Sequence, residues 1–139
     1  MTTAAIALDA RYHQRIQKIQ VQGITIMTLD FSQATSGETL AMLDDFRSAF
    51  DGLKPHSIRL LTDVSNFIYD SAVSSKWKVV RMEMDPFIKA SAIYGVDGLL
   101  GVAIRSYTEL MVWLNLPSAK TKLQVFKTRE KALAWLLEQ

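Results

Sequence analysis

The chain has 139 residues, of which 49% are hydrophobic and 22% are charged, values typical of a folded globular domain and not of a disordered segment. It contains no cysteine, which excludes disulfides, thiolate nucleophiles and cysteine-ligated metal centres. The formal net charge is only +2 and no cluster of consecutive lysines and arginines is present, so no nucleic-acid partner is expected. We therefore expect one domain spanning residues 1–139, with residues 1–10 as a loose lead-in.

Two segments bear on localisation. Residues 1–10 contain apolar side chains but no basic region before them, so no signal peptide is expected. Residues 99–116 form the longest apolar stretch, but Arg105 and Glu109 interrupt it. The stretch falls short of the roughly 20 predominantly apolar residues that a membrane span needs. The sequence therefore predicts no membrane span and a cytoplasmic protein.

The first elements are predicted to be a β-hairpin and a helix start. Residues 11–21 and 24–31 alternate between the two sides of a strand and include β-branched residues. Gln22-Gly23 between them suits a tight turn, because glycine adopts the positive φ that such turns require. Thr35 and Glu38 then have capping-box spacing, in which each side chain accepts a hydrogen bond from the other residue's backbone N–H.

A helix and a buried strand are expected next. The helix carries an apolar stripe at spacings of three and four, formed by Leu40, Leu43, Phe46, Phe50 and Leu53. Gly52 and Pro55 end it. Residues 58–61 are short, apolar and flanked by Pro55 and Asp63, which is typical of a strand at the centre of a sheet.

A polar loop and a second helix follow this strand. Asp70 and Ser71 are favoured residue types at a helix N-cap. The inner stripe of the helix is predicted to be Val73, Trp77, Val80 and Met84. Its solvent-facing residues are predicted to be Lys76, Lys78, Arg81 and Glu83. Asp85-Pro86 ends the helix, because the residue before a proline is disfavoured in the helical conformation.

The last third of the chain repeats the pattern of strand and helix. Residues 87–96 alternate as a strand, and the small residues 90–92 on it predict close packing against a helix. Residues 99–113 form a helix that is apolar over most of its circumference, which indicates deep burial or a partner surface. Residues 123–127 form a short strand, and Thr128 caps a final helix with Ala132, Trp135 and Leu136 on its inner stripe.

The element order is therefore β-β-α-β-α-β-α-β-α. Strands that alternate with single helices require right-handed crossovers and a parallel sheet. We expect an α/β fold with a mostly parallel sheet of about five strands, an N-terminal antiparallel hairpin and four helices. No linker, internal repeat or low-complexity tract divides the chain.

Three segments resemble one family. Residues 63–71, 89–99 and 125–136 are similar to the STAS or anti-sigma-factor-antagonist-like family, in particular to its uncharacterised bacterial branch. The resemblance implies a STAS-like sheet and a protein-interaction role without catalysis. In the antagonists, a partner kinase phosphorylates the first serine of an Asp-Ser-Ser-Gly corner, and Ser71 matches that serine by position. The chain departs from the motif at Ala72 and Val73, which replace the second serine and the glycine.

The candidate regulatory or binding corner consists of residues at the strand end, in the loop and on the next strand. Its members are Asp63, Ser65, Tyr69, Asp70, Ser71 and Lys89. Structural roles remain open for them: Asp70 and Ser71 as a helix cap worth about 1 kcal/mol, and Asp63 as a cap of the loop backbone. Lys89 either has a shifted pKa and a function, or extends its charged end from the sheet into water. Tyr69 and Tyr94 either line a pocket or belong to the core.

No catalytic, cofactor-binding or metal site is expected. His13 and His56 are the only histidines, and neither has a second ligand nearby in the sequence. The glycines at 95, 98 and 101 do not have the spacing of a phosphate-binding loop.

The sequence favours a non-enzymatic interaction or regulatory module that binds a protein partner or a second copy of itself. The alternative is a carrier of a small molecule or lipid, with an internal apolar cavity. An enzyme that uses Asp63, Ser71 or Lys89 is a third and weaker hypothesis.

Overall fold

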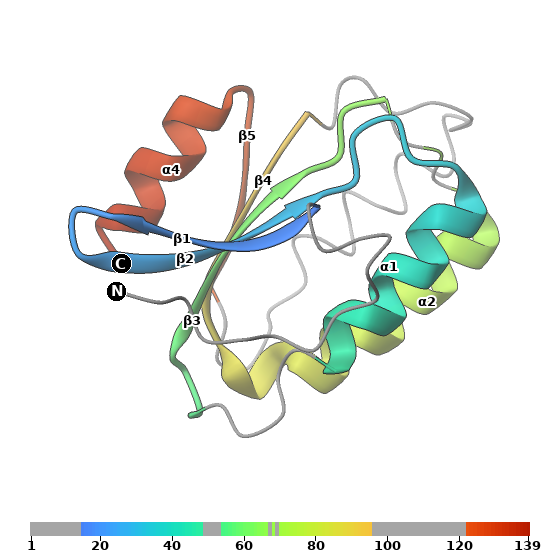
Figure 1. The fold of residues 1–139 in the computed structure, drawn as a ribbon, viewed down its shortest axis with the longest axis horizontal. Helices are drawn as coiled ribbons and strands as arrows, with labels where there is room; N and C mark the ends of the chain where they lie inside the picture. Colours follow the sequence, from blue (N-terminus) through green and yellow to red (C-terminus); the bar gives the residue numbers. More distant parts are fainter. Residues whose placement is uncertain (1–14, 49–53, 67, 69, 96–121) are drawn as a thin grey trace.

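The computed structural model describes residues 15–48, 54–66, 68, 70–95 and 122–139 (Figure 1). Its elements are β1 (Ile16–Val21), β2 (Ile24–Asp30), α1 (Ser36–Ser48), β3 (Ile58–Asp63), α2 (Ser71–Met84), a 3-10 turn (Asp85–Phe87), β4 (Ile88–Tyr94), β5 (Lys122–Phe126) and α4 (Arg129–Leu137). Three of the four expected helices are observed. The fourth, expected over residues 99–113, lies outside the described residues.

The sheet has five strands in the order β1-β2-β3-β4-β5. β1 and β2 form the antiparallel hairpin, and every other neighbouring pair is parallel. The predicted α/β class, the mostly parallel sheet and the hairpin are thus confirmed. β3 occupies the centre, as its short apolar run predicted, and its residues alternate toward two different helical layers.

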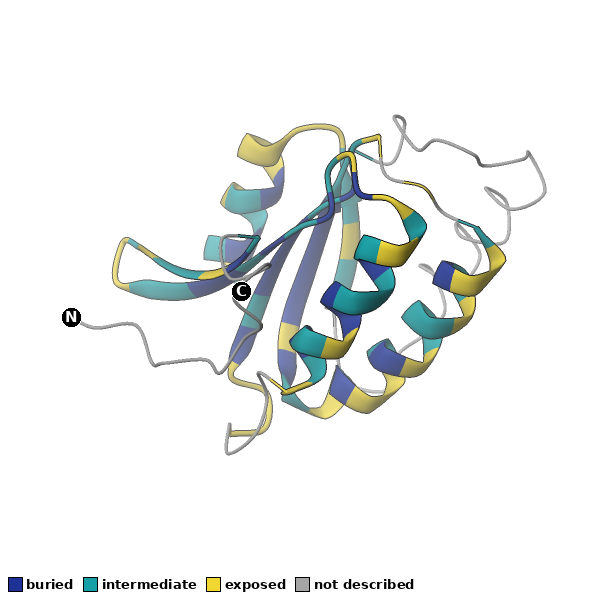
Figure 2. Cartoon of the chain, turned by 45° about the vertical axis from the view of Figure 1, so that its right-hand side comes forward, coloured by how far each residue is buried: buried dark blue, intermediate teal, exposed yellow. Residues whose placement is uncertain are grey.

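Helices cover both faces of the sheet (Figures 1 and 2). α1 and α2 lie side by side on one face, and α4 lies on the other. The larger core cluster fills the space under α1 and α2, whereas the smaller one lies under α4. In the smaller cluster Ala90 and Ala92 are fully buried together with Ala132 and Leu136 of α4. The predicted close packing of a helix on the small residues of β4 is therefore confirmed.

The capping box at the start of α1 forms as predicted. The Thr35 N–H donates to Glu38 Oε1 (3.1 Å), and the Glu38 N–H donates to Thr35 Oγ1 (3.2 Å). Both bonds satisfy backbone donors that have no partner within the helix. Of the expected stripe, Leu43 and Phe46 are buried, whereas Phe50 and Leu53 lie outside the described residues.

The inner stripe of α2 is also confirmed. Val73, Val80 and Met84 are buried, and Trp77 packs against Phe31 with ring centroids 5.4 Å apart.

The prediction that Arg81 faces solvent is wrong. Its side chain is half-buried and lines a cavity under α2. Arg81 follows Trp77 by one helical turn, so it lies at the flank of the buried stripe, where its aliphatic stem covers apolar surface. Burial lowers the pKa of Arg81, and the charge of Asp85 opposes that change.

Candidate functional site

The carboxyl ends of the parallel strands carry the corner that the sequence singled out. Two loops meet there, one between β2 and α1 and one between β3 and α2. The Gln33 N–H donates to Ser65 O (2.9 Å), and the Ile68 N–H donates to Ala34 O (3.1 Å). These bonds fix the two loops to each other, and therefore hold the first turns of α1 and α2 in one arrangement.

Asp63 and Ser65 shape the backbone of this corner. Asp63 ends β3, and its Oδ1 accepts a hydrogen bond from the Ser65 N–H at 2.8 Å. Gly95 follows β4 with φ +88°, and a Cβ atom there would lie 2.2 Å from Ser65 Oγ. Only glycine therefore fits at position 95, for both conformational and steric reasons.

Two residues without the freedom of glycine also adopt positive φ in these loops. Gln33 has φ 58° and Asn66 has φ 57°. Both line an open groove of about 350 Å³ between the loops, together with Ala34 and Ile68. Backbone conformations of this kind persist only where the surrounding structure enforces them.

Asp70 and Ser71 begin α2. Asp70 is the N-cap, and its Oδ1 accepts a hydrogen bond from the Val73 N–H at 2.9 Å. This bond, followed by one from the Ser36 hydroxyl of α1, lowers the pKa of Asp70. The helix-cap interpretation of Asp70 is confirmed. Ser71 is the first helical residue and is exposed, and its regulatory role stays a prediction.

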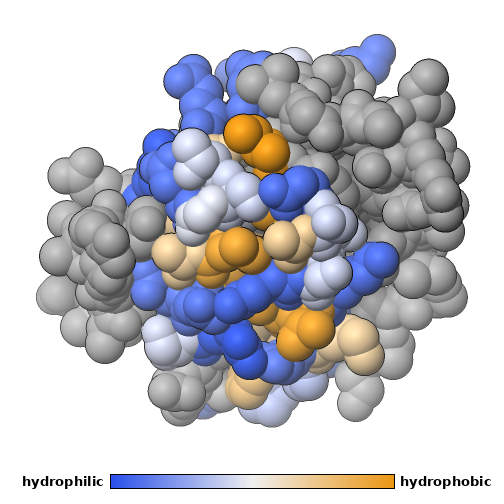
Figure 3. Space-filling model, turned by 90° about the vertical axis from the view of Figure 1, so that its right-hand side faces the viewer, coloured by the Kyte–Doolittle hydropathy of each residue, from blue (hydrophilic) through white to orange (hydrophobic). Residues whose placement is uncertain are grey.

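An uncharged outer stripe runs along α2 from this corner. We use this name for Ser71, Ser75, Val79 and Met82, which are all exposed and lie within about 80° of the helix circumference. Val79 is 51% exposed and Met82 is 76% exposed. Figure 3 faces the side of the molecule that carries α1 and α2, and shows apolar groups among the hydrophilic ones. The outer stripe is thus an uncharged strip with two exposed apolar side chains, Val79 and Met82.

Lys89 lies away from the corner. The register of β3 and β4 shifts between Ile58↔Ile88 and Arg59↔Ala90, so Lys89 is an extra residue at a bulge. It is exposed near the amino end of β4, whereas Asp63 is at the carboxyl end of the parallel neighbour β3. Tyr69 lies outside the described residues. Asp63 and Ser65 thus lie where β3 ends, and Asp70 and Ser71 lie where α2 begins, whereas Lys89 lies at the other end of the sheet.

A second polar site was missed in the sequence. A cavity of about 190 Å³ opens at the same end of the sheet, on the α4 side. Its lining residues are Arg15, Gln17, Thr28, Leu29, Asp30, Leu61, Asp63, Tyr94 and Arg129. The register aligns Asp30, Asp63 and Tyr94 on three neighbouring strands. A detectable signal was that β2, β3 and β4 each end on a polar or aromatic residue.

Tyr94 links this cavity to the corner. Burial, followed by the negative charge of Asp63, raises the pKa of Tyr94 to about 12, and the Tyr94 hydroxyl donates a hydrogen bond to Asp63. Tyr94 is therefore neutral near pH 7 and acts there as a hydrogen-bond donor. Tyr94 therefore lines a pocket and also packs against the smaller core cluster, so both alternatives hold in part.

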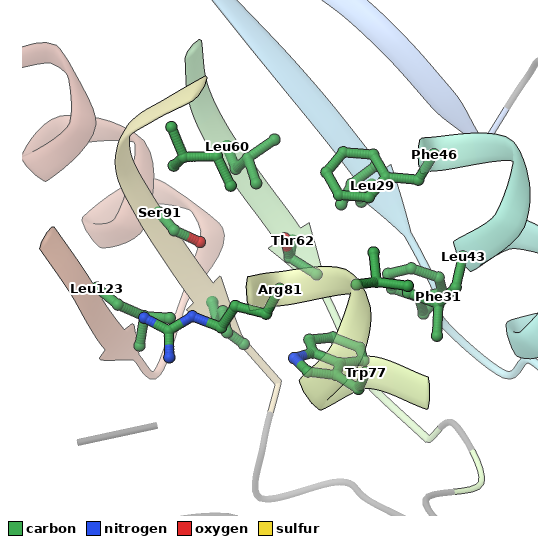
Figure 4. Close-up of a pocket in the computed structure, with 13 residues that line it drawn as sticks. Leu29, Phe31, Leu43, Phe46, Leu60, Thr62, Trp77, Arg81, Ser91 and Leu123 are labelled. Atoms are coloured by element: carbon green, nitrogen blue, oxygen red, sulfur yellow. The ribbon is translucent and has the colours of Figure 1, made fainter. Parts of the chain in front are cut away.

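An apolar cavity of about 50 Å³ lies between the helix pair and the sheet (Figure 4). Phe46 and Leu43 of α1, Trp77 of α2, and Leu60 of β3 are among the residues around it. Its volume is about a third of the ~150 Å³ of an engineered cavity that binds benzene. In this packing it has no room for the acyl chain of a lipid.

Within the described ranges, no helix is long and apolar enough to cross a membrane. Within the same ranges, no three histidine or carboxylate side chains are grouped so that they could hold a metal ion.

Comparison with known proteins places the fold. No protein-family model matches the chain, and no curated protein matches it. A solved structure, described as an uncharacterized protein of the DUF3478 family with a SpoIIAA-like fold from Shewanella loihica PV-4, superimposes with a TM-score of 0.61. The match covers 87% of this chain and 91% of the other, at 18% sequence identity. The resemblance seen in the sequence is confirmed for the fold: this chain has a SpoIIAA-like fold.

Proposed function

We propose that the protein is a non-enzymatic interaction or regulatory module, whose protein partner binds the outer stripe of α2. The observation that carries this proposal is the exposure of Val79 and Met82 on the helix that begins at Asp70 and Ser71. Their side chains point away from the core, since Val73 and Val80 on the inner stripe are buried. They therefore contribute little to the packing of the domain.

The chemistry of the outer stripe suits a protein partner. A patch with an uncharged centre and a polar rim resembles the core of a protein–protein interface. Methionine adapts its shape to a partner because its side chain is unbranched and polarizable. From Ser71 to Met82 the stripe extends for about 16 Å along the helix, which is enough for one helix or loop of a partner.

Phosphorylation of Ser71 would regulate this surface. A phosphate adds a charge of about −1.5 to −2 at neutral pH. Asp70 is adjacent, and its lowered pKa keeps it negatively charged at neutral pH. Asp70 also accepts the Val73 N–H, one of the donors that a phosphate at a helix N-terminus would use. The added charge would therefore repel Asp70 and change the end of the stripe that the partner contacts.

The experiment compares binding partners of the wild-type protein and of a Val79→Glu/Met82→Glu variant. The wild-type protein is used as bait in lysate of its native cells, and captured proteins are identified and then titrated as purified proteins. We expect the double variant to lose a partner that the wild type binds. Ala134→Glu is the matched control, because it places a charge at an exposed apolar residue of α4. Equal binding by the double variant and the wild type would contradict the proposal.

The regulatory part has its own pair of variants. Ser71→Asp adds a negative charge beside Asp70, whereas Ser75→Asp adds the same charge one turn further along the outer stripe. We expect Ser71→Asp to weaken partner binding more than Ser75→Asp does, and phosphopeptide mapping of the native protein to find phosphate on Ser71. A Ser71→Asp variant that binds as the wild type does would contradict the switch.

The partner that binds the outer stripe could be a second copy of the chain, in which case the protein forms a homodimer. Light scattering after size exclusion at low micromolar concentration measures it directly. A mass of two chains that falls to one in Val79→Glu/Met82→Glu would make the second copy the partner. A clean monomer for the wild type would contradict self-association and leave a different protein as the partner.

A further inference from the structure

The polar cavity on the α4 side holds charges of both signs. Arg15 precedes β1, and Asp30, Asp63 and Tyr94 end the neighbouring strands β2, β3 and β4. Arg129 begins α4. It lies on the opposite face of the sheet from α1 and α2, and so on a different side from the outer stripe of α2. A ligand bound here would leave the proposed partner surface free.

The opposite charges in the cavity do not neutralise each other directly. Within the described part of the chain, neither arginine forms an ion pair with Asp30 or Asp63. Arg15 Nη1 donates to the backbone oxygens of Asp30 (3.3 Å) and Ser32 (3.2 Å). Arg129 is exposed and donates no hydrogen bond to another described residue. Its positive charge acts on Tyr94 across the cavity. The guanidinium of Arg129 is therefore available to an anionic group.

Two arrangements around the cavity oppose the stability of the fold. Asp30 and Asp63 are register partners on the adjacent parallel strands β2 and β3, and two neighbouring negative charges repel each other. Arg129 is the first residue of α4, where the positive end of the helix dipole disfavours a cation. Departures from these local rules are concentrated at functional sites in natural proteins. Both departures lie around this one cavity.

The two carboxylates also have capacity for a ligand. Oδ1 of Asp30 accepts the Ser32 N–H at 2.9 Å, and Oδ1 of Asp63 accepts the Ser65 N–H at 2.8 Å. In each aspartate, the backbone N–H thus binds Oδ1. The second oxygen of Asp30 takes no backbone donor among the described residues, and Asp63 receives the Tyr94 hydroxyl in addition. Each aspartate shapes its loop and still presents negative charge to the cavity.

We infer that this cavity binds a small zwitterion, specifically a free α-amino acid of the size of alanine. The ammonium group lies between Asp30 and Asp63, and the carboxylate pairs with Arg129. The volume of about 190 Å³ exceeds the ~150 Å³ that accommodates benzene, a ligand of about six non-hydrogen atoms. Alanine has the same number of non-hydrogen atoms and carries both charges, so it matches the cavity in size and in chemistry.

Isothermal titration calorimetry of the full chain tests the inference with three probes. L-alanine carries both charges, whereas ethylamine carries only the cation and propionate only the anion. We expect alanine to bind saturably, and each singly charged probe to bind at least roughly tenfold more weakly, because each lacks one charge-assisted contact. No saturable heat with alanine up to about 10 mM, or equal binding of either singly charged probe, would overturn the inference.

Three variants locate the binding. Arg129→Gln removes the cation from the start of α4, and Asp63→Asn removes a negative charge while its Oδ1 still accepts the Ser65 N–H. We expect each to weaken alanine binding roughly tenfold or more. Glu130→Gln is the matched control, because Glu130 is exposed beside Arg129 and does not line the cavity. Circular dichroism checks that each variant is folded. Unchanged alanine binding in folded Arg129→Gln and Asp63→Asn would place the ligand elsewhere and overturn the site.

Discussion

The two faces of the sheet are packed with side chains of different size. Under α1 and α2 the core contains large residues such as Phe31 and Met42, whereas under α4 it contains Ala90, Ala92 and Ala132. Large side chains keep the helix pair away from the sheet and enclose only a small apolar cavity. Small side chains let α4 approach closely, and the polar cavity opens beside its first residue. The large side chains under α1 and α2 thus form the face that stabilises the fold. The small side chains under α4 leave room for a ligand on the other face.

The largest expected effect comes from the helix-pair face. Phe31→Ala removes a fully buried ring that packs against Trp77. The lost burial and the cavity left behind should lower the free energy of unfolding by about 3–5 kcal/mol. Urea denaturation followed by tryptophan fluorescence measures the change. A loss below about 1 kcal/mol would show that this face does not carry the main packing energy.

On the α4 face, a larger side chain should destabilise the fold by overpacking. Ala92→Leu adds three carbon atoms beneath α4, where position 92 is fully buried. We expect a loss of about 1–3 kcal/mol in the free energy of unfolding, because α4 must move outward. Leu60→Ala is the comparison, because Leu60 of β3 faces α1 and α2 on the other side of the sheet. There the loss of stability must come from the cavity that the smaller side chain leaves. A stable Ala92→Leu variant would contradict the close approach of α4.

Local patterns were sufficient to predict much of this fold. The capping box of Thr35 and Glu38 and the N-cap at Asp70 involve residues a few positions apart, so their geometry follows from the spacing. The hairpin and the buried strand β3 follow from alternation and turn residues in the same way. These features were confirmed because neighbouring residues alone determine them.

The polar cavity could not be predicted in this way. Asp30, Asp63 and Tyr94 are separated by more than 30 residues from one to the next, and only the register of three strands aligns them. The bulge at Lys89 likewise depends on pairing with β3. Lys89 lies near the amino end of β4, at the other end of the sheet from the corner. The prediction that Arg81 faces solvent was wrong. Helical spacing gives the direction in which a side chain points, but not how far the neighbouring sheet extends beneath the helix.

The cap of α2 gives a smaller effect with a defined pH dependence. Asp70→Ala should lower the free energy of unfolding by about 1 kcal/mol at neutral pH. Hydrogen bonds from Val73 first, and then from Ser36, lower the pKa of Asp70 from its ordinary value of 3.8. The stabilisation by its charge is therefore complete above that ordinary value, and it is lost as the pH falls through the lowered pKa.

Asp70→Asn separates the cap from the charge. Asparagine still accepts the Val73 N–H, so most of the stability at neutral pH should remain while its pH dependence is reduced. Urea denaturation of the wild type and both variants between pH 2 and pH 7 measures these contributions (about five pH values suffice). Equal pH dependence of the wild type and Asp70→Asn would show that this carboxylate does not titrate with folding.

The smallest expected effect concerns the ion pairs that join α1 to α2. Arg47 binds Glu83 through two bonds, Nε to Oε2 at 2.8 Å and Nη2 to Oε1 at 2.7 Å, and Lys76 Nζ lies 2.6 Å from Asp44 Oδ1. The side chains of Arg47 and Glu83 are 38% and 39% exposed, so water and salt screen their attraction. We expect Glu83→Gln to change the free energy of unfolding by about 0.2–1 kcal/mol at low salt, and by less in 1 M NaCl. Urea denaturation at both salt concentrations measures the difference. Glu130→Gln on α4 is the control, because Glu130 forms no ion pair with another residue of the described ranges. A loss that is large and independent of salt would mean that the ion pair, and not the apolar layer beneath it, holds α1 and α2 together.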